Sequence, residues 1–376
     1  MRILFIQPGI GTYRIDFFNE LAKRCILKVI YFYDDSSGQR FPEPLASKLV
    51  GCEVEKVVGG FDLRGYYPVR PHLGKVISNF KPDVVVGYEY NTLMLHLVLL
   101  HLSARKKWKL FLWTSDNIEI ATECKLFRRV FRWIGVQLSD GVLLYSSIVK
   151  DYYSVLFPSK NFLILPNIQS EEKIREKVYS AKNEAIDLSV KYDLSRKKVF
   201  LYVGRFHPVK NIPMLLESWK KAELNDSVLV LIGDGPENKT INRLVQDLKI
   251  KENTILTGSQ YENSLWAWFL IGNVLILPST FETYGAVINE ALACGIPCIV
   301  SRHVGANVLI SDHNGIVFKE DTHQCLSEAL RKIGKTLKTS NDFTLDESLM
   351  PQRLDQFVDS FCSFLACNKS EKKDVN

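Results

Sequence analysis

The chain has 376 residues, of which 46% are hydrophobic, 24% charged and 11% aromatic, a composition typical of a folded protein and not of a disordered or fibrous one. This length exceeds what one hydrophobic core usually organises, so we expect two domains. The net charge of +6 is too weak to indicate nucleic-acid binding, and the sequence contains no zinc-finger, RRM or helix-turn-helix signature.

The cysteines and the apolar runs bear on where the protein is found. The eight cysteines form no CxxC pair and have no histidine partner at zinc-ligand spacing, which predicts reduced thiols in a cytoplasmic protein. The first residues enter a strand without the features of a signal peptide, so secretion is not expected. The longest apolar run, 93–102, is about half the length that spans a bilayer, and we interpret it as a buried helix.

Short apolar, β-branched runs alternate with helical stretches in the first half of the chain. The predicted strands are 3–6, 27–33, 84–88, 110–113, 141–145 and 162–165. Runs that are apolar throughout indicate strands covered on both faces, as in a parallel sheet with crossover helices. Gly9 and Gly11 follow the first strand, and we interpret them either as a tight turn that needs positive φ or as part of a ligand site.

A basic and aromatic segment lies in the same half. The span 105–132 is rich in Lys and Arg, and within it Lys125 to Trp133 mixes cations with Phe127, Phe131 and Trp133 at near-helical spacing. One interpretation is an interfacial helix that rests on an anionic membrane surface. The other is a helix whose apolar face belongs to the core and whose cations are solvated.

The strand pattern repeats after a charged connection over 169–198. The predicted strands of this half are 199–203, 228–232, 254–257, 274–277, 298–300 and 315–318. The sequence therefore predicts an α/β fold with two doubly wound domains in series. We place them at 1–168 and 169–350, with the junction near Asn167, and assign 351–376 to a C-terminal amphipathic helix and a polar tail.

The most informative stretch follows the strand 274–277. We predict a turn and then a helix that opens after Thr283, which caps it, and that ends at Gly295. Ligands of open α/β sheets bind at this edge, and a helix start favours an anion such as a diphosphate. Glu282 precedes the predicted helix and Glu290 lies about two turns inside it, so we expect them to accept hydrogen bonds from different sugar hydroxyls of one extended ligand.

Two cations follow the strand 199–203. Arg205 and Lys210 are able to neutralise a diphosphate without a metal, and no Asp-x-Asp motif follows a strand, so we expect neither a metal nor a cofactor. The alternative for these side chains is a surface ion pair. We interpret 233–236 as a turn after a strand.

These elements together resemble the family-four group of retaining glycosyltransferases, which have the GT-B fold. The matching elements are Gly204-Arg205, Lys210-Asn211, Gly233-Asp234-Gly235-Pro236, Gly258, Pro278-Ser279 and the Glu-x7-Glu pair of Glu282 and Glu290, with softer matches at Pro8-Gly9-x-Gly11 and Pro166-Asn167. The resemblance implies two Rossmann-like domains that face each other across a cleft, with the C-terminal helix returning to the first. It also implies transfer of a sugar, with retention, from a nucleotide-diphosphate sugar to a glycan or lipid-linked acceptor in cell-surface polysaccharide synthesis.

The resemblance also assigns roles to individual residues. It implies that Arg205 and Lys210 hold the diphosphate, that Glu290 accepts from the ribose hydroxyls and that Glu282 holds the transferred sugar. The remaining residues that it places at the donor are Tyr284, Gly285, Ala286, Gly204, Gly258 and Gly11. The chain departs from the family pattern where 112–117 lacks a His and where Thr283 replaces a common Gly. We expect the leaving diphosphate to take the acceptor proton, because no protein nucleophile is well placed in the sequence.

The acceptor is expected on the N-terminal side. Glu89 and Asp116 each follow a predicted strand and are the candidates to contact it, although Asp116 also fits a helix cap. If Lys125 to Trp133 is interfacial, the protein is peripheral on the inner face of the plasma membrane and its acceptor is lipid-linked. The rival functions are a nucleotide-sugar epimerase, a non-catalytic scaffold and a dinucleotide oxidoreductase, and the last is disfavoured because Arg14 stands where its glycine motif needs Gly.

Overall fold

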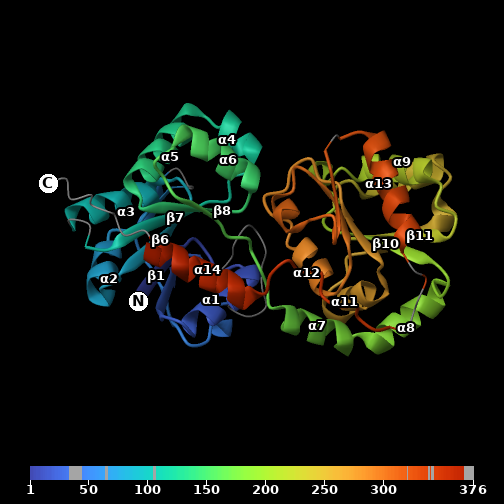
Figure 1. Cartoon of the computed structure of the whole chain (residues 1–376), viewed down its shortest axis with the longest axis horizontal. Helices are drawn as coiled ribbons and strands as arrows, with labels where there is room; N and C mark the ends of the chain where they lie inside the picture. Colours follow the sequence, from blue (N-terminus) through green and yellow to red (C-terminus); the bar gives the residue numbers. More distant parts are fainter. Residues whose placement is uncertain are drawn as a thin grey trace. The chain divides into compact units, whose positions relative to one another are not determined.

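The computed structural model describes residues 1–33, 45–63, 67–104, 107–319, 321–337, 339 and 343–367, and it divides into two compact units (Figure 1). The N-terminal unit contains residues 1–169 together with the C-terminal segment that begins at Leu354, and the C-terminal unit contains residues 170–353. The sequence places the two boundaries at 168 and 350. The polar tail from residue 368 and the first two cations of the basic span, Arg105 and Lys106, lie outside the described residues.

A parallel sheet of seven strands forms the centre of the N-terminal unit, in the order β3-β2-β1-β6-β7-β8-β9. Its strands are β1 (Arg2–Gln7), β2 (Ile26–Tyr31), β3 (Glu53–Lys56), β6 (Val84–Tyr88), β7 (Lys109–Trp113), β8 (Gly141–Leu144) and β9 (Phe162–Ile164). The six predicted strands are all present. Sequence analysis missed β3 because this partly exposed edge strand has alternating charges and no apolar run, and it also missed the antiparallel pair β4 (Phe61–Leu63) and β5 (Tyr67–Val69).

Helices cover both faces of this sheet. They are α1 (Thr12–Ala22), α2 (Leu73–Phe80), α3 (Thr92–Ser103), α4 (Ile118–Glu123), α5 (Leu126–Leu138) and α6 (Ser147–Leu156), with a 3-10 turn, η1 (Leu45–Lys48). Leu4 and Ile6 of β1 belong to a core cluster with residues of α2, α3 and α5. Phe5 points to the other face, where its ring lies 5.0 Å from that of Phe18 in α1. This alternation explains why the strands are apolar throughout.

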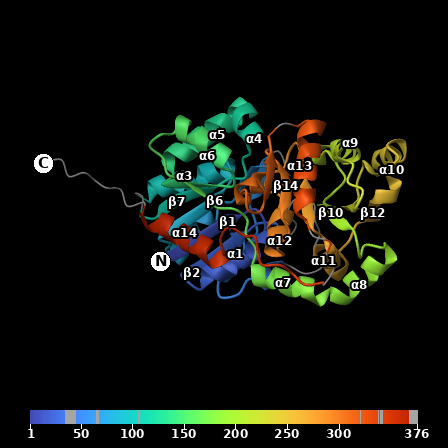
Figure 2. The same cartoon turned by 45° about the vertical axis from the view of Figure 1, so that its right-hand side comes forward.

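The last helix of the chain, α14 (Leu354–Cys367), belongs to the N-terminal unit and lies beside α1 (Figures 1 and 2). The ring of Phe361 is 5.9 Å from Phe5 and 5.5 Å from Phe17. Arg24 also forms an ion pair with Asp359 at 2.6 Å. The expected return of the C-terminal helix to the N-terminal domain is therefore confirmed.

The C-terminal unit is built on a parallel sheet of six strands in the order β12-β11-β10-β13-β14-β15. The strands are β10 (Lys198–Val203), β11 (Ser227–Ile232), β12 (Thr254–Gly258), β13 (Val274–Leu277), β14 (Cys298–Ser301) and β15 (Gly315–Phe318). The strand order reverses between β10 and β13. Such a reversal leaves the loops after the neighbouring strands splayed apart, which is where ligands of open α/β sheets bind.

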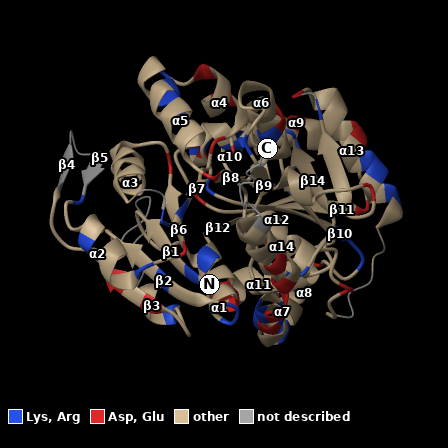
Figure 3. Ribbon diagram, turned by 60° about the vertical axis from the view of Figure 1, so that its left-hand side comes forward, with Lys and Arg blue, Asp and Glu red and all other residues tan. Residues whose placement is uncertain are grey.

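Seven helices and three 3-10 turns complete the described part of this unit. The helices are α7 (Glu171–Ser180), α8 (Lys182–Lys191), α9 (Ile212–Ala222), α10 (Asn238–Asp247), α11 (Glu262–Ile271), α12 (Val287–Ala293) and α13 (His323–Thr336), and the turns are η2 (Pro208–Lys210), η3 (Lys251–Asn253) and η4 (Gly305–Leu309). The charged connection 169–198 thus folds largely into α7 and α8, which pack on α11. Basic and acidic residues lie close together along α7, where they are coloured blue and red in Figure 3.

Among the described helices, none is long and apolar enough to cross a membrane. The apolar run 93–102 lies in α3, where Leu93, Met94 and Leu97 are buried as expected. The seven cysteines whose side chains are described are free thiols. Burial raises the pKa of the Cys25 thiol to about 11, so this group stays protonated near neutral pH.

Candidate donor-binding site

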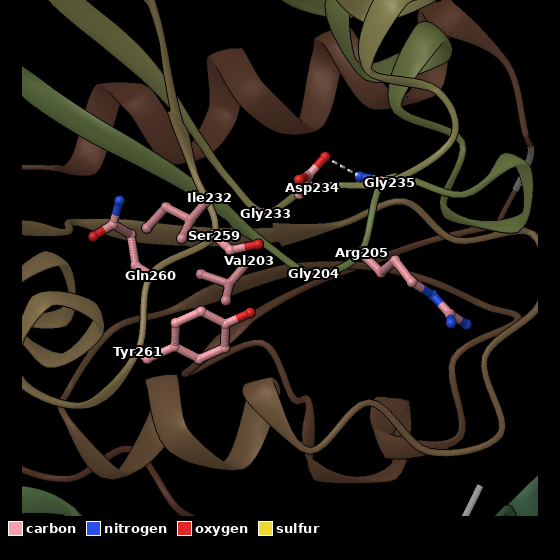
Figure 4. A pocket seen from close by; sticks show the side chains of 10 residues that line it. All are labelled: Val203, Gly204, Arg205, Ile232, Gly233, Asp234, Gly235, Ser259, Gln260 and Tyr261. Atoms are coloured by element: carbon pink, nitrogen blue, oxygen red, sulfur yellow. Dashed lines mark hydrogen bonds between the residues drawn. The ribbon is translucent and has the colours of Figure 1, made fainter. Parts of the chain in front are cut away.

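The loops after β10, β11 and β12 enclose a pocket of about 510 Å³ at the carboxyl edge of the C-terminal sheet (Figure 4). Its lining consists of Val203, Gly204, Arg205, Ile232, Gly233, Asp234, Gly235, Ser259, Gln260 and Tyr261. The volume lies within the roughly 300–1,000 Å³ that is usual for small-molecule sites. The pocket is open to solvent and combines an apolar wall with several polar side chains.

Glycines allow these loops to approach one another closely. A Cβ atom on Gly233 would lie 2.0 Å from the carbonyl oxygen of Gly204, and one on Gly235 would lie 2.3 Å from that of Phe206. Backbone hydrogen bonds join the same loops, from Gly204 to Ile232 at 3.0 Å and from Phe206 to Asp234 at 2.8 Å. Residues 233–236 therefore form the predicted turn, and this turn is also a wall of the pocket.

Arg205 supplies a positive charge at the rim of the pocket. Its side chain is exposed, forms no ion pair within the described residues, and points away from the other labelled side chains (Figure 4). Burial, together with the negative charges of Glu282 and Glu237, raises the pKa of Tyr202 well above its usual range. The Tyr202 hydroxyl therefore stays protonated and donates to the carbonyl oxygen of Arg205 at 3.3 Å, which fixes the backbone at this position.

Lys210 and Glu282 are in direct contact. The Nζ of Lys210 donates to Oε2 of Glu282, and each side chain is only 17% exposed. Lys210 therefore forms an ion pair, as the alternative interpretation expected. Its partner, however, is Glu282, which is itself predicted to lie at the donor site. The pair changes the charge balance, because Glu282 offsets one of the two cations expected to neutralise a diphosphate.

The helix after β13 begins later than predicted. It starts at Val287 with Ala286 as its N-cap residue, no side chain caps it, and Glu290 therefore lies in its first turn. The backbone before it pairs with a neighbouring loop instead of winding into a helix: Glu282 accepts from Gly305 at 3.1 Å and Tyr284 accepts from Ala306 at 2.7 Å. The predictions that Thr283 caps the helix and that Glu290 lies two turns inside it are therefore wrong.

Gly285 is required at this turn for two reasons. Its φ is +89°, in the left-handed region that favours glycine. A Cβ atom there would also approach Leu277 to 2.9 Å and Val304 to 3.0 Å. The helix ends as predicted, since Gly295 follows its C-cap residue with a φ of +79°.

The structure connects most of the predicted donor residues through these loops. The amide of Thr280 donates to the carbonyl oxygen of Val209 at 2.9 Å, which ties the loop after β13 to the turn that carries Lys210. Tyr284 is buried, and Gly285, Ala286 and Glu290 are partly exposed around it. Gly258 has a φ of +72° and accepts from Gly233 at 3.0 Å, but it does not line the pocket.

Sequence analysis missed the residues that give the pocket its size. Val203 and Ile232 form its apolar wall, and Ser259, Gln260 and Tyr261 close its far side. Their position at or just after the carboxyl ends of strands was the available signal, because the carboxyl ends of parallel strands meet at one edge.

The two acceptor candidates in the N-terminal unit, Glu89 and Asp116, are both paired with Arg128. Asp116 has a side chain that is 0% exposed; it accepts from Arg128 at 2.5 Å and from the hydroxyl of Tyr153. Asn117, not Asp116, caps α4, with its side chain accepting from Ile120 at 2.9 Å. The helix-cap interpretation of Asp116 is therefore wrong, and its contact with the acceptor stays a prediction for a buried, paired carboxylate.

Glu89 remains partly accessible, with 17% of its side chain exposed. It has a φ of +64° and is held by Ser115, whose amide donates at 2.8 Å, and by Arg128 at 2.9 Å. A non-glycine residue in the left-handed region costs free energy, and such strain often marks functional positions. Glu89 is therefore the stronger of the two acceptor candidates.

The predicted basic helix is α5, and its cations differ in direction. Arg128 turns inward to Asp116 and Glu89, and Arg132 is buried, donating to the carbonyl oxygen of Ala121 at 2.7 Å. The expectation that both are solvated or lipid-facing is therefore wrong.

Gly11 precedes α1 with a φ of −87°, so it does not need positive φ. The ring of Tyr13 covers it instead, and a Cβ atom on Gly11 would lie 2.8 Å from that ring.

Comparison with known proteins finds a family that matches most of the C-terminal unit. Residues 187–344 match the family described as Glycosyl transferases group 1. The N-acetyl-alpha-D-glucosaminyl L-malate synthase of Bacillus anthracis is 30% identical over 171 residues, 45% of this chain and 43% of the relative. The UDP-Gal:alpha-D-GlcNAc-diphosphoundecaprenol alpha-1,3-galactosyltransferase of Escherichia coli is 34% identical over 119 residues, 30% of each chain. The chain thus matches less than half the length of these relatives.

Solved structures match over nearly the full length. Anabaena HepE in complex with UDP has a TM-score of 0.71 at 16% identity, covering 97% of this chain and 100% of the other. The lipopolysaccharide outer core galactosyltransferase WaaB has a TM-score of 0.67 at 18% identity, covering 96% and 95%. At this identity the likeness establishes the fold. Residues 187–344 therefore match the group 1 glycosyltransferase family, the chain has the GT-B fold, and its resemblance to the family-four glycosyltransferases is confirmed.

Proposed function

We propose that the protein is a retaining glycosyltransferase that takes a sugar from a nucleotide-diphosphate donor and transfers it to a glycan or lipid-linked acceptor in cell-surface polysaccharide synthesis. The observation that carries the proposal is the pocket after β10, β11 and β12, with Arg205 at its rim and the Lys210–Glu282 pair on the neighbouring loops. An apolar wall suits a nucleobase, and cations beside it suit the phosphates that follow.

The paired Lys210 and Glu282 support a division of labour at the donor. A diphosphate that approaches Lys210 competes with Glu282 for its ammonium protons, because both are anions. Glu282 is then available to accept hydrogen bonds from hydroxyls of the sugar. Glu290, in the first turn of α12, is proposed to accept from the ribose. The Glu-x7-Glu spacing of these two carboxylates supports retention through the family resemblance.

The site is proposed to work without a metal. Arg205 and Lys210 supply two positive charges against the one negative charge of Glu282. This balance is less favourable for a diphosphate than two free cations would be. The backbone at the start of α12, which no side chain caps, is proposed to supply the remaining positive potential.

The acceptor side is proposed to use Glu89, and the membrane is proposed to lie against the outer face of α5. On that face Leu126 is 76%, Val130 46% and Trp133 59% exposed, while Lys125 and Arg129 are exposed cations. An exposed apolar stripe flanked by cations suits an anionic lipid surface. The Escherichia coli relative is named for a diphosphoundecaprenol-linked acceptor, which supports a lipid-linked acceptor here.

Donor binding and turnover test the proposal. UDP is the first probe, because Anabaena HepE was solved with UDP and with UDP-glucose. UDP at 100 times its dissociation constant is expected to stabilise the protein by about 2.7 kcal/mol in a thermal unfolding assay. Lys210→Ala and Glu290→Ala are each expected to lower turnover of the accepted UDP-sugar by about two orders of magnitude or more, since such contacts contribute roughly 2.7–4 kcal/mol.

Lys239→Ala is the matched control, because Lys239 is an exposed lysine of α10 outside the pocket. Transfer above half the parental rate in either site variant would contradict the assignment. Activity is expected to survive EDTA; complete loss that magnesium or manganese restores would contradict the metal-free site.

The same experiment separates the rival functions. An epimerase converts its nucleotide-sugar without acceptor, whereas a transferase releases the nucleotide only as the sugar moves to an acceptor. A non-catalytic scaffold would bind UDP and give no product with any donor or acceptor extract. The presence of Arg205, Lys210, Glu282 and Glu290 together favours the transferase.

A further inference from the structure

A second cavity lies in the N-terminal unit, between α2 and α3. Its volume is about 600 Å³, and its lining consists of Gly74, Ile77, Ser78, Lys81, Pro82, Asp83, Leu100, Ser103, Ala104, Lys107 and Trp108. Asp83 directly precedes β6 and Trp108 directly precedes β7, so the cavity is at the amino edge of the sheet. Glu89 follows the carboxyl end of β6. The proposed acceptor side and this cavity therefore lie at opposite edges of the sheet.

The interior of the cavity is apolar. Ile77 and Trp108 are each only 6% exposed and form its wall together with Leu100 and Ala104. Small residues on both helices leave the gap open, and a Cβ atom on Gly74 would already come within 3.3 Å of Leu100. A sugar or nucleotide would need polar partners along such a wall, so the wall favours a hydrocarbon chain.

The rim of the cavity is basic. Lys81 and Lys107 are exposed and have no ion-pair partner within the described residues. The carboxylate of Asp83, the one acid in the lining, is engaged, because it accepts from the backbone amide of Arg2 at 2.7 Å. The rim therefore attracts an anion.

The apolar surface extends beyond the cavity along α3. Leu99 is 65% exposed and Leu102 is 43% exposed, on the helix that also supplies Leu100 and Ser103 to the lining. Exposed leucines beside an apolar cavity are typical of a site for a hydrophobic ligand.

From these observations we propose that the gap between α2 and α3 binds a medium-chain fatty acid, with its hydrocarbon chain against Ile77 and Trp108 and its carboxylate at Lys81 and Lys107. The volume, within the roughly 300–1,000 Å³ of small-molecule sites, suits one chain. The inference does not depend on the proposed glycosyl transfer, because the site lies at the other edge of the sheet.

Isothermal titration calorimetry with dodecanoate, below its micelle concentration, tests this site in the full-length protein. One equivalent of dodecanoate is expected to bind per chain. Dodecyltrimethylammonium, which has the same chain and a cationic head, is expected to bind at least about tenfold more weakly, since the lysines repel it.

Two variants address the two ends of the ligand. Ala104→Leu fills the apolar part and is expected to abolish binding, whereas Lys81→Gln with Lys107→Gln is expected to weaken it by about tenfold or more. Lys75→Gln is the matched control, because Lys75 is an exposed lysine of α2 outside the lining. The lysine changes lie at the surface and leave the fold unaltered, so they remain informative if Ala104→Leu impairs folding.

Absence of saturable dodecanoate binding to the parent would overturn the proposal. So would equal affinity for the cationic amphiphile, or undiminished binding after the lysine changes. Near-UV circular dichroism of the full-length protein serves as an independent measure of folding in each variant. It is expected to be unchanged.

Discussion

Individual side chains in this protein are often paired with other residues that the sequence singled out. Lys210 and Glu282 lie 72 positions apart in the chain and contact each other, as do Arg128 and Asp116, 12 positions apart. In both cases two charged residues with separate predicted roles form one unit. A role assigned to a single charged residue from its place in the sequence therefore has to be revised once its partner is known.

Arg128 offers the sharpest test at this scale. Arg128→Ala leaves the buried carboxylate of Asp116 without its cation, and we expect a loss of roughly 3 kcal/mol in the free energy of unfolding, at the low end for a broken buried pair because Arg128 is 31% exposed. Chemical denaturation of the N-terminal unit measures it.

Arg129→Ala is the matched control, since the exposed Arg129 donates to the carbonyl oxygen of Thr122 at 2.8 Å and forms no ion pair within the described residues. Its expected cost is under about 1 kcal/mol. Equal costs for the two variants would show that the buried pair contributes nothing specific. The phenol of Tyr153 still donates to Asp116 in either variant, because burial, followed by the charge of Asp116, raises its pKa well above the usual range.

Helix α5 shows how an element divides its residues between two environments. Arg128 and Arg132 face inward, while Leu126, Val130 and Trp133 face outward with Lys125 and Arg129. The positions of the basic residues along the helix are coloured blue in Figure 3. Reversing the charge of all its arginines would therefore damage the interior of the unit and could not test membrane contact alone.

The proper test changes only the outer face. Lys125→Glu with Arg129→Glu is expected to reduce flotation with anionic vesicles at least severalfold, because each cation near such a surface contributes about 1 kcal/mol. Trp133→Ser is expected to reduce it as well, through loss of apolar contact. Liposome flotation at low salt, with neutral vesicles as a second arm, makes the measurement.

Lys239→Glu with Lys251→Glu provides the control, because it makes the same charge change at exposed lysines of the C-terminal unit. Equal flotation of this variant and the α5 variant would indicate attraction through net charge. No flotation of the parent would remove the membrane from the proposal and leave a soluble acceptor.

At the scale of the whole molecule, the N-terminal unit is completed by the end of the chain. The face of its sheet around Phe5 is closed by α14, in which Val358 and Phe361 are 0% exposed and Leu365 is 1% exposed. The unit therefore cannot reach its final packing until the C-terminal unit, which lies between in the sequence, has been synthesised.

Phe361→Ala tests this closure. We expect a loss of about 3–5 kcal/mol in the free energy of unfolding of the N-terminal unit, as for other fully buried Phe→Ala changes. Phe357→Ala, at a partly exposed position of the same helix, is expected to cost less. Urea unfolding followed by near-UV circular dichroism measures both, and UDP binding by the C-terminal unit is expected to be unaffected. A cost for Phe361→Ala no larger than that for Phe357→Ala would contradict the packing of α14.

The sequence by itself determined the strands, the two doubly wound sheets and the family resemblance. These are periodic or local signals: twelve apolar runs, each long enough for one strand, and a fixed spacing between glycines and charged residues. A buried parallel strand must be apolar on both faces, so its pattern survives without knowledge of its neighbours. Edge strand β3, exposed and charged, lacked that pattern and was missed.

Only the tertiary structure decided which side chains meet. The contacts of Lys210 with Glu282, of Arg128 with Asp116, and of Phe361 with Phe5 join segments that no local pattern links. The start of α12 was likewise decided by distant residues, because the amides of Gly305 and Ala306 bond the carbonyl groups that a longer helix would have used. Local sequence patterns determine where helices and strands form. Whether a charged side chain is stable when buried depends on its partner, and the partner is known only once the chain has folded.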